Sequence, residues 1–317
     1  MVHALDVSAP ANPHMFRSAC PYSVTSSGIA NSCLSPGVLW SGDTPFPSTV
    51  QTLDLLRSKS KTIVFVTNNS TKSRADYCSK LTSMGIHATV EEVFGSSYSA
   101  AIYISRILPK SYPELATTKR TVFVIGESGI EQELDSENVP HICGSDPKFR
   151  RDMTSEDYKA IAAGDASILD PSVGVVLVGL DFHFNYFKMA LAYHYLRAGA
   201  LFLATNIDST LPSAGALFPG AGTMSAPLTK MLGKEPLALG KPSQAMMDAI
   251  EGKFKFDRSK ACMVGDRAGT DIKFGLEGKL GGTLAVLTGV SSKEEFLDGE
   301  VRPAAYVDKL SDLLGGA

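Results

Sequence analysis

Short apolar runs alternate with amphipathic segments over most of the chain. The runs are rich in β-branched residues and are each of strand length; they cover residues 62–66, 121–125, 173–178, 201–204, 261–264 and 283–287. The segments between them have apolar positions at helical spacing, and the clearest cover residues 47–59, 72–84, 100–108 and 186–197. Continuous apolar strands separated by helices predict parallel strands that are covered on both faces, and hence an α/β fold.

Two breaks in this pattern predict that a second domain is inserted into the first. Residues 109–118 are rich in Pro, Tyr and Lys and are expected to lead out of the first domain, and residues 232–236 are expected to lead back. We therefore predict one domain from residues 37–108 and 237–317, and a second domain from residues 109–236.

The first 36 residues differ from the rest. They are rich in Ser, Ala and Pro and show no sustained period of a strand or a helix, which is typical of an unstructured tail. Residues 29–35 read Ile-Ala-Asn-Ser-Cys-Leu-Ser, which is not the dense apolar run of a central parallel strand. We therefore expect no core strand before Gly37, where the regular pattern begins abruptly.

The composition excludes several classes of protein. With 44% hydrophobic and 20% charged residues among 317, the chain has an ordinary globular composition, and a net charge of −3 argues against non-specific nucleic-acid binding. No run approaches the ~18 apolar residues of a membrane span. The five cysteines show no Cys-x-x-Cys spacing, which favours a reducing compartment. We expect a cytoplasmic protein that binds neither nucleic acid nor membranes.

Candidate chemistry lies where predicted strands end. Asp266 and Asp271 are five residues apart in a Gly-punctuated turn that follows residues 261–264. The carboxyl end of a buried strand is where open α/β sheets bind ligands, and carboxylate oxygens suit Mg²⁺; the alternative is that these residues only cap the next helix. Thr67 ends another predicted strand, and Lys241 lies in a Gly-Lys-Pro turn. A hydroxyl, a cation and a metal-binding carboxylate together can hold a phosphoryl group.

In this order and spacing, these segments resemble motifs two, three and four of the haloacid dehalogenase (HAD) superfamily of phosphatases. The resemblance runs from about Gly37 to Leu314 and is strongest to the fungal members of the 4-nitrophenylphosphatase and phosphoglycolate phosphatase branch. Its most specific phrases are Gly-Val-Leu-Trp at 37–40, Val-Thr-Asn-Asn-Ser-Thr at 66–71 and Gly-Leu-Asp-Phe-His-Phe at 179–184. It implies a Rossmannoid core with a parallel sheet and an inserted α/β cap domain of the C2 type.

The resemblance also implies an activity and its residues. The activity is Mg²⁺-dependent hydrolysis of small phosphorylated metabolites such as 2-phosphoglycolate, with 4-nitrophenyl phosphate as an artificial substrate. Thr67 and Asn68 would hold phosphoryl oxygens, and Lys241 would neutralise their charge. Asp266 would ligate Mg²⁺ directly. Asp271 would support the metal site without touching the ion, or would hold Lys241.

The cap domain would select the substrate, and in the family it can also form a homodimer. Asp181, His183 and Asn206 follow predicted strands of this domain and are its candidate substrate-binding residues. For His183 the alternative is a packed core side chain, because it stands between two Phe residues. The Gly-rich stretch 219–223 lacks the Lys-Ser/Thr of a P-loop and is interpreted as the passage from cap to core.

The first family motif, Asp-x-Asp-Gly-Val-Leu-Trp, is not intact. Alignment on residues 37–40 places Leu34 at the nucleophile and Pro36 at the general acid and base, and neither side chain can do this chemistry. Two explanations stay open: a degenerate family member, or residues 1–36 translated from the wrong exon structure, since residues 34–37 can be encoded by a splice-acceptor sequence. The first explanation corresponds to a catalytically inactive phosphometabolite-binding or interaction protein, and the second to a phosphatase.

Overall fold

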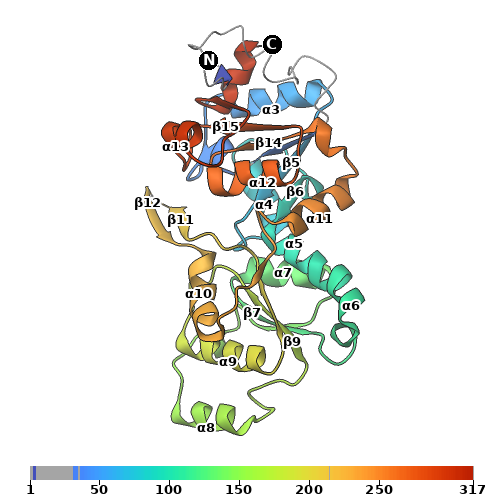
Figure 1. The fold of residues 1–317 in the computed structure, drawn as a ribbon, viewed down its shortest axis with the longest axis vertical. Helices are drawn as coiled ribbons and strands as arrows, with labels where there is room; N and C mark the ends of the chain where they lie inside the picture. Colours follow the sequence, from blue (N-terminus) through green and yellow to red (C-terminus); the bar gives the residue numbers. More distant parts are fainter. Residues whose placement is uncertain (1–2, 5–30, 35, 214, 317) are drawn as a thin grey trace. The chain divides into compact units, whose positions relative to one another are not determined.

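The structure, a computed structural model, describes residues 3–4, 31–34, 36–213 and 215–316. It divides into two compact units. The first contains the described residues up to Thr67, residues 78–94, and the chain from Lys241 onward; the second contains residues 68–77 and 95–240. Each unit is built around its own sheet (Figure 1). None of the helices in the described part of the chain is long and apolar enough to cross a membrane.

The first unit contains a seven-stranded sheet. In sheet order its strands are β1 (His3–Ala4), β16 (Ala305–Val307), β15 (Gly282–Val286), β14 (Ala261–Gly265), β2 (Asn31–Leu34), β5 (Thr62–Thr67) and β6 (Val93–Gly95). The pairs from β16 to β5 are parallel, and β1 is antiparallel to β16. The predicted strands 62–66, 261–264 and 283–287 are therefore confirmed as β5, β14 and β15 to within a residue or two.

The strand β2 contradicts the expectation that no core strand precedes Gly37. Residues 31–34 lie between β14 and β5, and Leu34 pairs with Val264 on one side and with Phe65 on the other. A backbone segment with a buried parallel strand on each side gains hydrogen bonds along both edges, whatever its side chains contribute. Pro36 then begins a helical turn, α2 (Pro36–Leu39), a position that proline favours. Residues 5–30 and 35 lie outside the described part of the chain.

Helices cover this sheet on both faces. Figure 1 shows α3 on one side of β14 and β15, with α12 on the other. The helices that contribute to this unit are α3 (Thr49–Ser58), α4 (Arg74–Ser83, shared with the second unit), α11 (Gln244–Phe254), α12 (Lys273–Glu277) and α13 (Lys293–Asp298). The predicted helices 47–59 and 72–84 are thus confirmed as α3 and α4.

The second unit contains a five-stranded sheet in which every pair is parallel. In sheet order its strands are β13 (Leu237–Ala238), β10 (Leu201–Ala204), β9 (Val173–Val178), β7 (Thr121–Ile125) and β8 (His141–Cys143). All residues of β7 and β9 are buried, as their continuous apolar sequence predicts. The main helices around it are α5 (Ser96–Ile102), α7 (Ser128–Ser136), α8 (Ser155–Ala163), α9 (Tyr186–Arg197) and α10 (Ala221–Leu232). A hairpin of β11 (Thr210–Ser213) and β12 (Ala216–Pro219) completes it.

The chain crosses from one unit to the other at residues that differ from the predicted domain boundaries. The predicted boundaries are 108/109 and 236/237, whereas the chain passes between units at 67/68, 77/78, 94/95 and 240/241. The proline-rich break begins a helical turn instead of a linker, because Pro109 is among the first residues of α6 (Leu108–Ser111).

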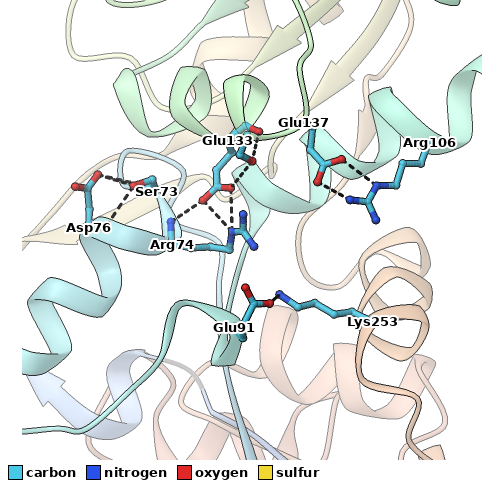
Figure 2. Close-up of polar contacts among 9 residues, drawn as sticks. Ser73, Arg74, Asp76, Glu91, Arg106, Glu133, Glu137 and Lys253 are labelled. Carbon is cyan, nitrogen blue, oxygen red and sulfur yellow. Dashed lines mark hydrogen bonds and ion pairs between the residues drawn. The ribbon is translucent and has the colours of Figure 1, made fainter.

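Hydrogen bonds between Arg74 and Glu133 attach residues 68–77 to the second unit. The backbone N–H and the guanidinium of Arg74 both donate to the carboxylate of Glu133 in α7, at 2.6 and 3.0 Å (Figure 2). Glu133 is buried, and the guanidinium also lies over the ring of Tyr98, 3.3 Å from its centroid. A charge-assisted pair of this kind is stronger than a neutral hydrogen bond and fixes the start of α4 on α7.

Candidate active site

A buried ion pair lies at the carboxyl end of β5 in the first unit. The ammonium of Lys241 donates to the Asp271 carboxylate at 2.7 Å and to the backbone carbonyl of Val66 at 2.9 Å. Both charged side chains are almost fully buried, where Coulomb attraction is stronger than in water. The cation is therefore held beside Thr67, the last residue of β5 and itself buried.

Asp271 also shapes the turn that follows β14. Its second carboxylate oxygen accepts hydrogen bonds from the backbone N–H groups of Asp266 and Arg267, at 3.1 and 3.2 Å. A Cβ on Gly265 would collide with the Asp271 side chain, so only glycine fits at the end of this strand. With one oxygen on Lys241 and the other on the backbone, Asp271 connects the ends of β14 and β5.

Asp266 follows β14 and is buried. Its carboxylate accepts a hydrogen bond from the N–H of Val290 at 3.1 Å, and Gly37 and Gly289 approach it so closely that a Cβ on either would overlap it. Burial, followed by the charge of Asp271, raises the pKa of Asp266 to about 6. Such a carboxylate is stabilised in its charged form by a cation, so its chemistry suits a metal ligand.

The donors available to Mg²⁺ are nevertheless few. Among the described residues no group of three His, Cys, Asp or Glu side chains could hold a metal ion. Asp271 is engaged with Lys241, and Leu34 and Pro36 carry no donor oxygen on their side chains. Mg²⁺ is commonly held by one or two carboxylates with water and substrate phosphate. Asp266 alone meets the lower end of that range, so it could hold the ion together with water and a substrate phosphate.

The remaining candidates lie in the second unit. Asn68 donates from its side chain to the Asp208 carboxylate at 3.1 Å. Its backbone carbonyl accepts hydrogen bonds from the Asn206 amide at 2.7 Å and from the Ser96 hydroxyl at 2.8 Å. Asn206, predicted to bind substrate, thus contacts the chain immediately after Thr67.

A second buried ion pair fixes the loop that contains His183. The ammonium of Lys188 lies 2.7 Å from the Asp181 carboxylate, and neither side chain has any exposed surface. The other oxygen of Asp181 accepts from the backbone N–H of His183 at 2.8 Å, and Lys188 also donates to the carbonyl of Gly144 at 3.0 Å. Asp181 therefore fixes the backbone of this loop through contacts that are buried inside the second unit.

His183 itself is exposed, so the alternative of a packed core histidine is wrong. The neighbouring Phe182 is also exposed, at 65%. Sequence reasoning missed Lys188, although a signal exists: it is a cation on the face of α9 whose other buried members include Phe187 and Leu191. A charged residue at a buried helical position requires a partner.

The fold and these groups define the class of protein: a parallel α/β core with a buried Lys–Asp pair, a threonine and a second carboxylate at the carboxyl ends of its strands, and a second α/β unit inserted into it. A haloacid dehalogenase-like hydrolase family model matches residues 35–140, and a second HAD-hydrolase-like model matches residues 238–313.

Known relatives agree. The 4-nitrophenylphosphatase of Schizosaccharomyces pombe is 49% identical over 280 residues, which is 87% of this chain and 90% of that protein. Phosphoglycolate phosphatase 1A of Arabidopsis thaliana is 40% identical over 283 residues, 88% of this chain and 74% of that protein. The glycerol phosphate phosphatase of Mycobacterium tuberculosis, solved in complex with magnesium, superposes with a TM-score of 0.74 at 28% identity, over 92% of this chain and 78% of that one.

The chain therefore belongs to the haloacid dehalogenase-like hydrolases, in the branch of the 4-nitrophenylphosphatases and phosphoglycolate phosphatases. The resemblance found in the sequence and the predicted fold, an α/β core with an inserted α/β unit, are both confirmed. Family and fold thus assign it to the HAD-type phosphatases, a class of phosphomonoesterases that act on small phosphorylated substrates.

Proposed function

We propose that the first unit binds the phosphate of small phosphomonoesters such as 2-phosphoglycolate, and that hydrolysis requires carboxylates at positions 34 and 36. The sequence with Leu34 and Pro36 then acts as a phosphometabolite-binding protein. The same fold with the family residues there is a Mg²⁺-dependent phosphomonoesterase. The observation that supports this proposal is the register of β2 in its sheet.

Leu34 is the last residue of β2 and pairs with Val264 and Phe65. Each of these partners lies two residues before a candidate site residue, Asp266 on one strand and Thr67 on the other. The backbone at position 34 is therefore placed between the strand ends that carry the carboxylate and the hydroxyl. This placement supports position 34 as the bearer of a nucleophile that attacks a phosphorus atom held there.

The residues present can bind phosphate without completing the reaction. Lys241, held by Val66 and Asp271, supplies the positive charge, and Thr67 supplies a hydroxyl and a backbone N–H. A carboxylate nucleophile would form an aspartyl-phosphate and an acid would protonate the leaving oxygen, but a Leu and a Pro side chain do neither. Mg²⁺, where bound, supplies charge neutralisation at the phosphate. With Asp266 as its carboxylate, we expect weak binding of this ion.

The substrate range follows from the relatives, whose names include phosphatases of 4-nitrophenyl phosphate and phosphoglycolate. We propose that the exposed loop with Phe182 and His183 contacts the part of the metabolite beyond its phosphate. A cytoplasmic location, which rests on the sequence, and a homodimer formed through the second unit, which is an expectation from the family, are parts of the same proposal.

The test compares the chain as written with the variants L34D, P36D and the double variant, with D266N added to the double variant as the control. We expect no release of 4-nitrophenol by the first protein. Turnover should appear with L34D and rise a further ~10²–10⁴-fold in the double variant, the usual contribution of a general acid and base. Titration calorimetry should show tighter Mg²⁺ binding by the double variant. Equal Mg²⁺ affinity, or turnover by the unaltered chain, would contradict the proposal.

The 5′ end of the transcript, read from cDNA, decides which function the organism uses. A sequence encoding an Asp-x-Asp strand before Gly37 would assign the phosphatase activity. A transcript that encodes Leu34 and Pro36 would assign the binding function.

A further inference from the structure

The chain passes between its two units immediately beside two candidate phosphate-binding residues. One crossing joins Thr67 of the first unit to Asn68 of the second, and another joins Gly240 of the second to Lys241 of the first. Within the second unit these crossings meet, because a Cβ on Gly240 would lie only 2.6 Å from the side-chain oxygen of Asn68. Whatever fixes Asn68 and Gly240 therefore acts one residue away from Thr67 and Lys241.

Three side chains of the second unit hold Asn68. Asn206 and Ser96 both donate to its backbone carbonyl, at 2.7 and 2.8 Å, and Asp208 accepts from its side-chain amide at 3.1 Å. Asn206 and Ser96 are almost fully buried. We call Ser96, Asn206 and Asp208 the crossover clamp. Buried hydrogen bonds to a backbone carbonyl fix a main-chain position, since their loss would leave a desolvated polar group.

The side-chain amide of Asn206 makes three hydrogen bonds inside the second unit. Its amide donates to Asn68 and, at 3.3 Å, to the hydroxyl of Thr205, and its carbonyl oxygen accepts from the backbone N–H of Asp208 at 3.1 Å. The last bond sets the loop that presents the Asp208 carboxylate to Asn68. This arrangement gives Asn206 a structural role inside the second unit beside the substrate-binding role that the sequence predicts.

The second crossing, at Gly240, is fixed by residues just before Asn206 in the sequence. The N–H of Leu239 donates to the carbonyl of Ala204 at 2.9 Å, which extends the pairing of β13 with β10 toward the crossing. A Cβ on Gly240 would overlap the carbonyl of Thr205, so only glycine allows this approach. On the first-unit side, Lys241 in turn donates to the carbonyl of Val66.

We propose that Ser96, Asn206 and Asp208 are positioning residues for the phosphate-binding pair of Thr67 and Lys241. They act through Asn68 and Gly240 and do not touch the substrate. The functional part of this proposal rests on the proposed phosphate-binding role of the pair. Its structural part, the fixing of the two crossings, does not depend on that role.

The experiment uses the full chain and two measurements on N206A and D208A. Hydrogen exchange followed by mass spectrometry reports the crossings without any ligand, and titration calorimetry with inorganic phosphate reports the pocket. T154A is the control: its hydroxyl accepts from the Asp157 N–H and caps α8 of the same unit, so it loses similar hydrogen bonds elsewhere. G240A, with G252A as the matched control where a Cβ meets nothing within 4 Å, repeats the test at the second crossing.

We expect N206A and D208A to speed exchange about tenfold in peptides that cover residues 66–71 and 236–241, the effect of losing one hydrogen bond. Phosphate affinity should fall by about the same factor, and T154A should change neither. Faster exchange confined to residues 205–208, or unchanged exchange in both crossing peptides, would overturn the proposal. If the unaltered chain binds no phosphate, the proposed function fails, while the exchange result still decides whether the clamp fixes the crossings.

Discussion

The pair of Lys188 and Asp181 allows a quantitative prediction about the second unit. Replacing Lys188 with Met keeps an unbranched side chain that is one atom shorter, but removes the ammonium that contacts Asp181 at 2.7 Å and the Gly144 carbonyl at 3.0 Å. Neither charged side chain has any exposed surface, so the remaining carboxylate would be buried without its cation. Removing one partner of a buried ion pair typically costs about 3–5 kcal/mol, far more than the pair itself contributes.

The prediction is therefore a loss of about 3–5 kcal/mol in the free energy of unfolding for K188M. For a unit of about 150 residues, each kcal/mol lowers the melting temperature by ~2–4 °C, which gives a fall of ~6–20 °C. Differential scanning calorimetry measures both quantities. K159M replaces an exposed lysine on α8 and serves as the control; it should lie within about 0.5 kcal/mol of the unaltered chain.

The double variant K188M/D181N distinguishes the mechanism. It removes the uncompensated charge while keeping a polar group of similar size, so it should be more stable than K188M and show a coupling energy well above 1 kcal/mol, a size reached only by contacting residues. A loss below about 1 kcal/mol for K188M, or a double variant no more stable than the single one, would refute the reasoning that this pair is desolvated.

Two further predictions concern stability. The hydrogen bond from Arg151 lowers the pKa of the Asp157 carboxyl well below its ordinary 3.8. Because the folded pKa is lowered, this carboxylate stabilises the fold above about pH 4 and loses that effect as the pH falls. The gap in urea midpoint between D157N and the unaltered chain should thus narrow between about pH 6 and pH 2.5, and a constant gap would count against the pair. Replacing Gly289 with Ala drives a Cβ into the Asp266 carboxylate and should cost about 1–3 kcal/mol in thermal unfolding. G252A, in open space on α11, should be neutral or stabilising; equal melting temperatures would contradict the packing argument.

Much of the fold was predictable because it depends on local patterns. The strands β7, β9 and β10 and the helix α9 have the predicted bounds, since buried parallel strands leave continuous apolar runs and the helix has its own cap at Asn185. The expectation that candidate site residues lie at the carboxyl ends of strands in an α/β sheet was also correct for Thr67, the last residue of a strand, and for Asp266, which directly follows one. These inferences need no knowledge of which segments meet.

The unit boundaries and the partners of Lys188 and Asn206 could not be predicted in the same way. The division at Thr67 depends on Arg74 binding Glu133, 59 residues away, and on Asn68 binding Asp208, 140 residues away. A proline-rich stretch such as residues 109–118 looks like a linker only until the helical turn that it begins is known. Sequence identifies a charged residue at a buried position, but three-dimensional contact identifies its partner.

The structural role of β2 and its catalytic role depend on different parts of the chain, the first on the backbone and the second on the side chains. The sequence Asn-Ser-Cys-Leu predicts that the loss of the first family motif is both structural and catalytic, because neither a dense apolar run nor a carboxylate is present. The structural half of that expectation is wrong: backbone pairing with β14 and β5 places residues 31–34 in the centre of the sheet without an apolar run. Hydrogen bonding along a strand depends little on side-chain identity, whereas attack on phosphorus depends on it entirely. The side chain at position 34 can therefore determine turnover while the strand that carries it keeps its place in the fold.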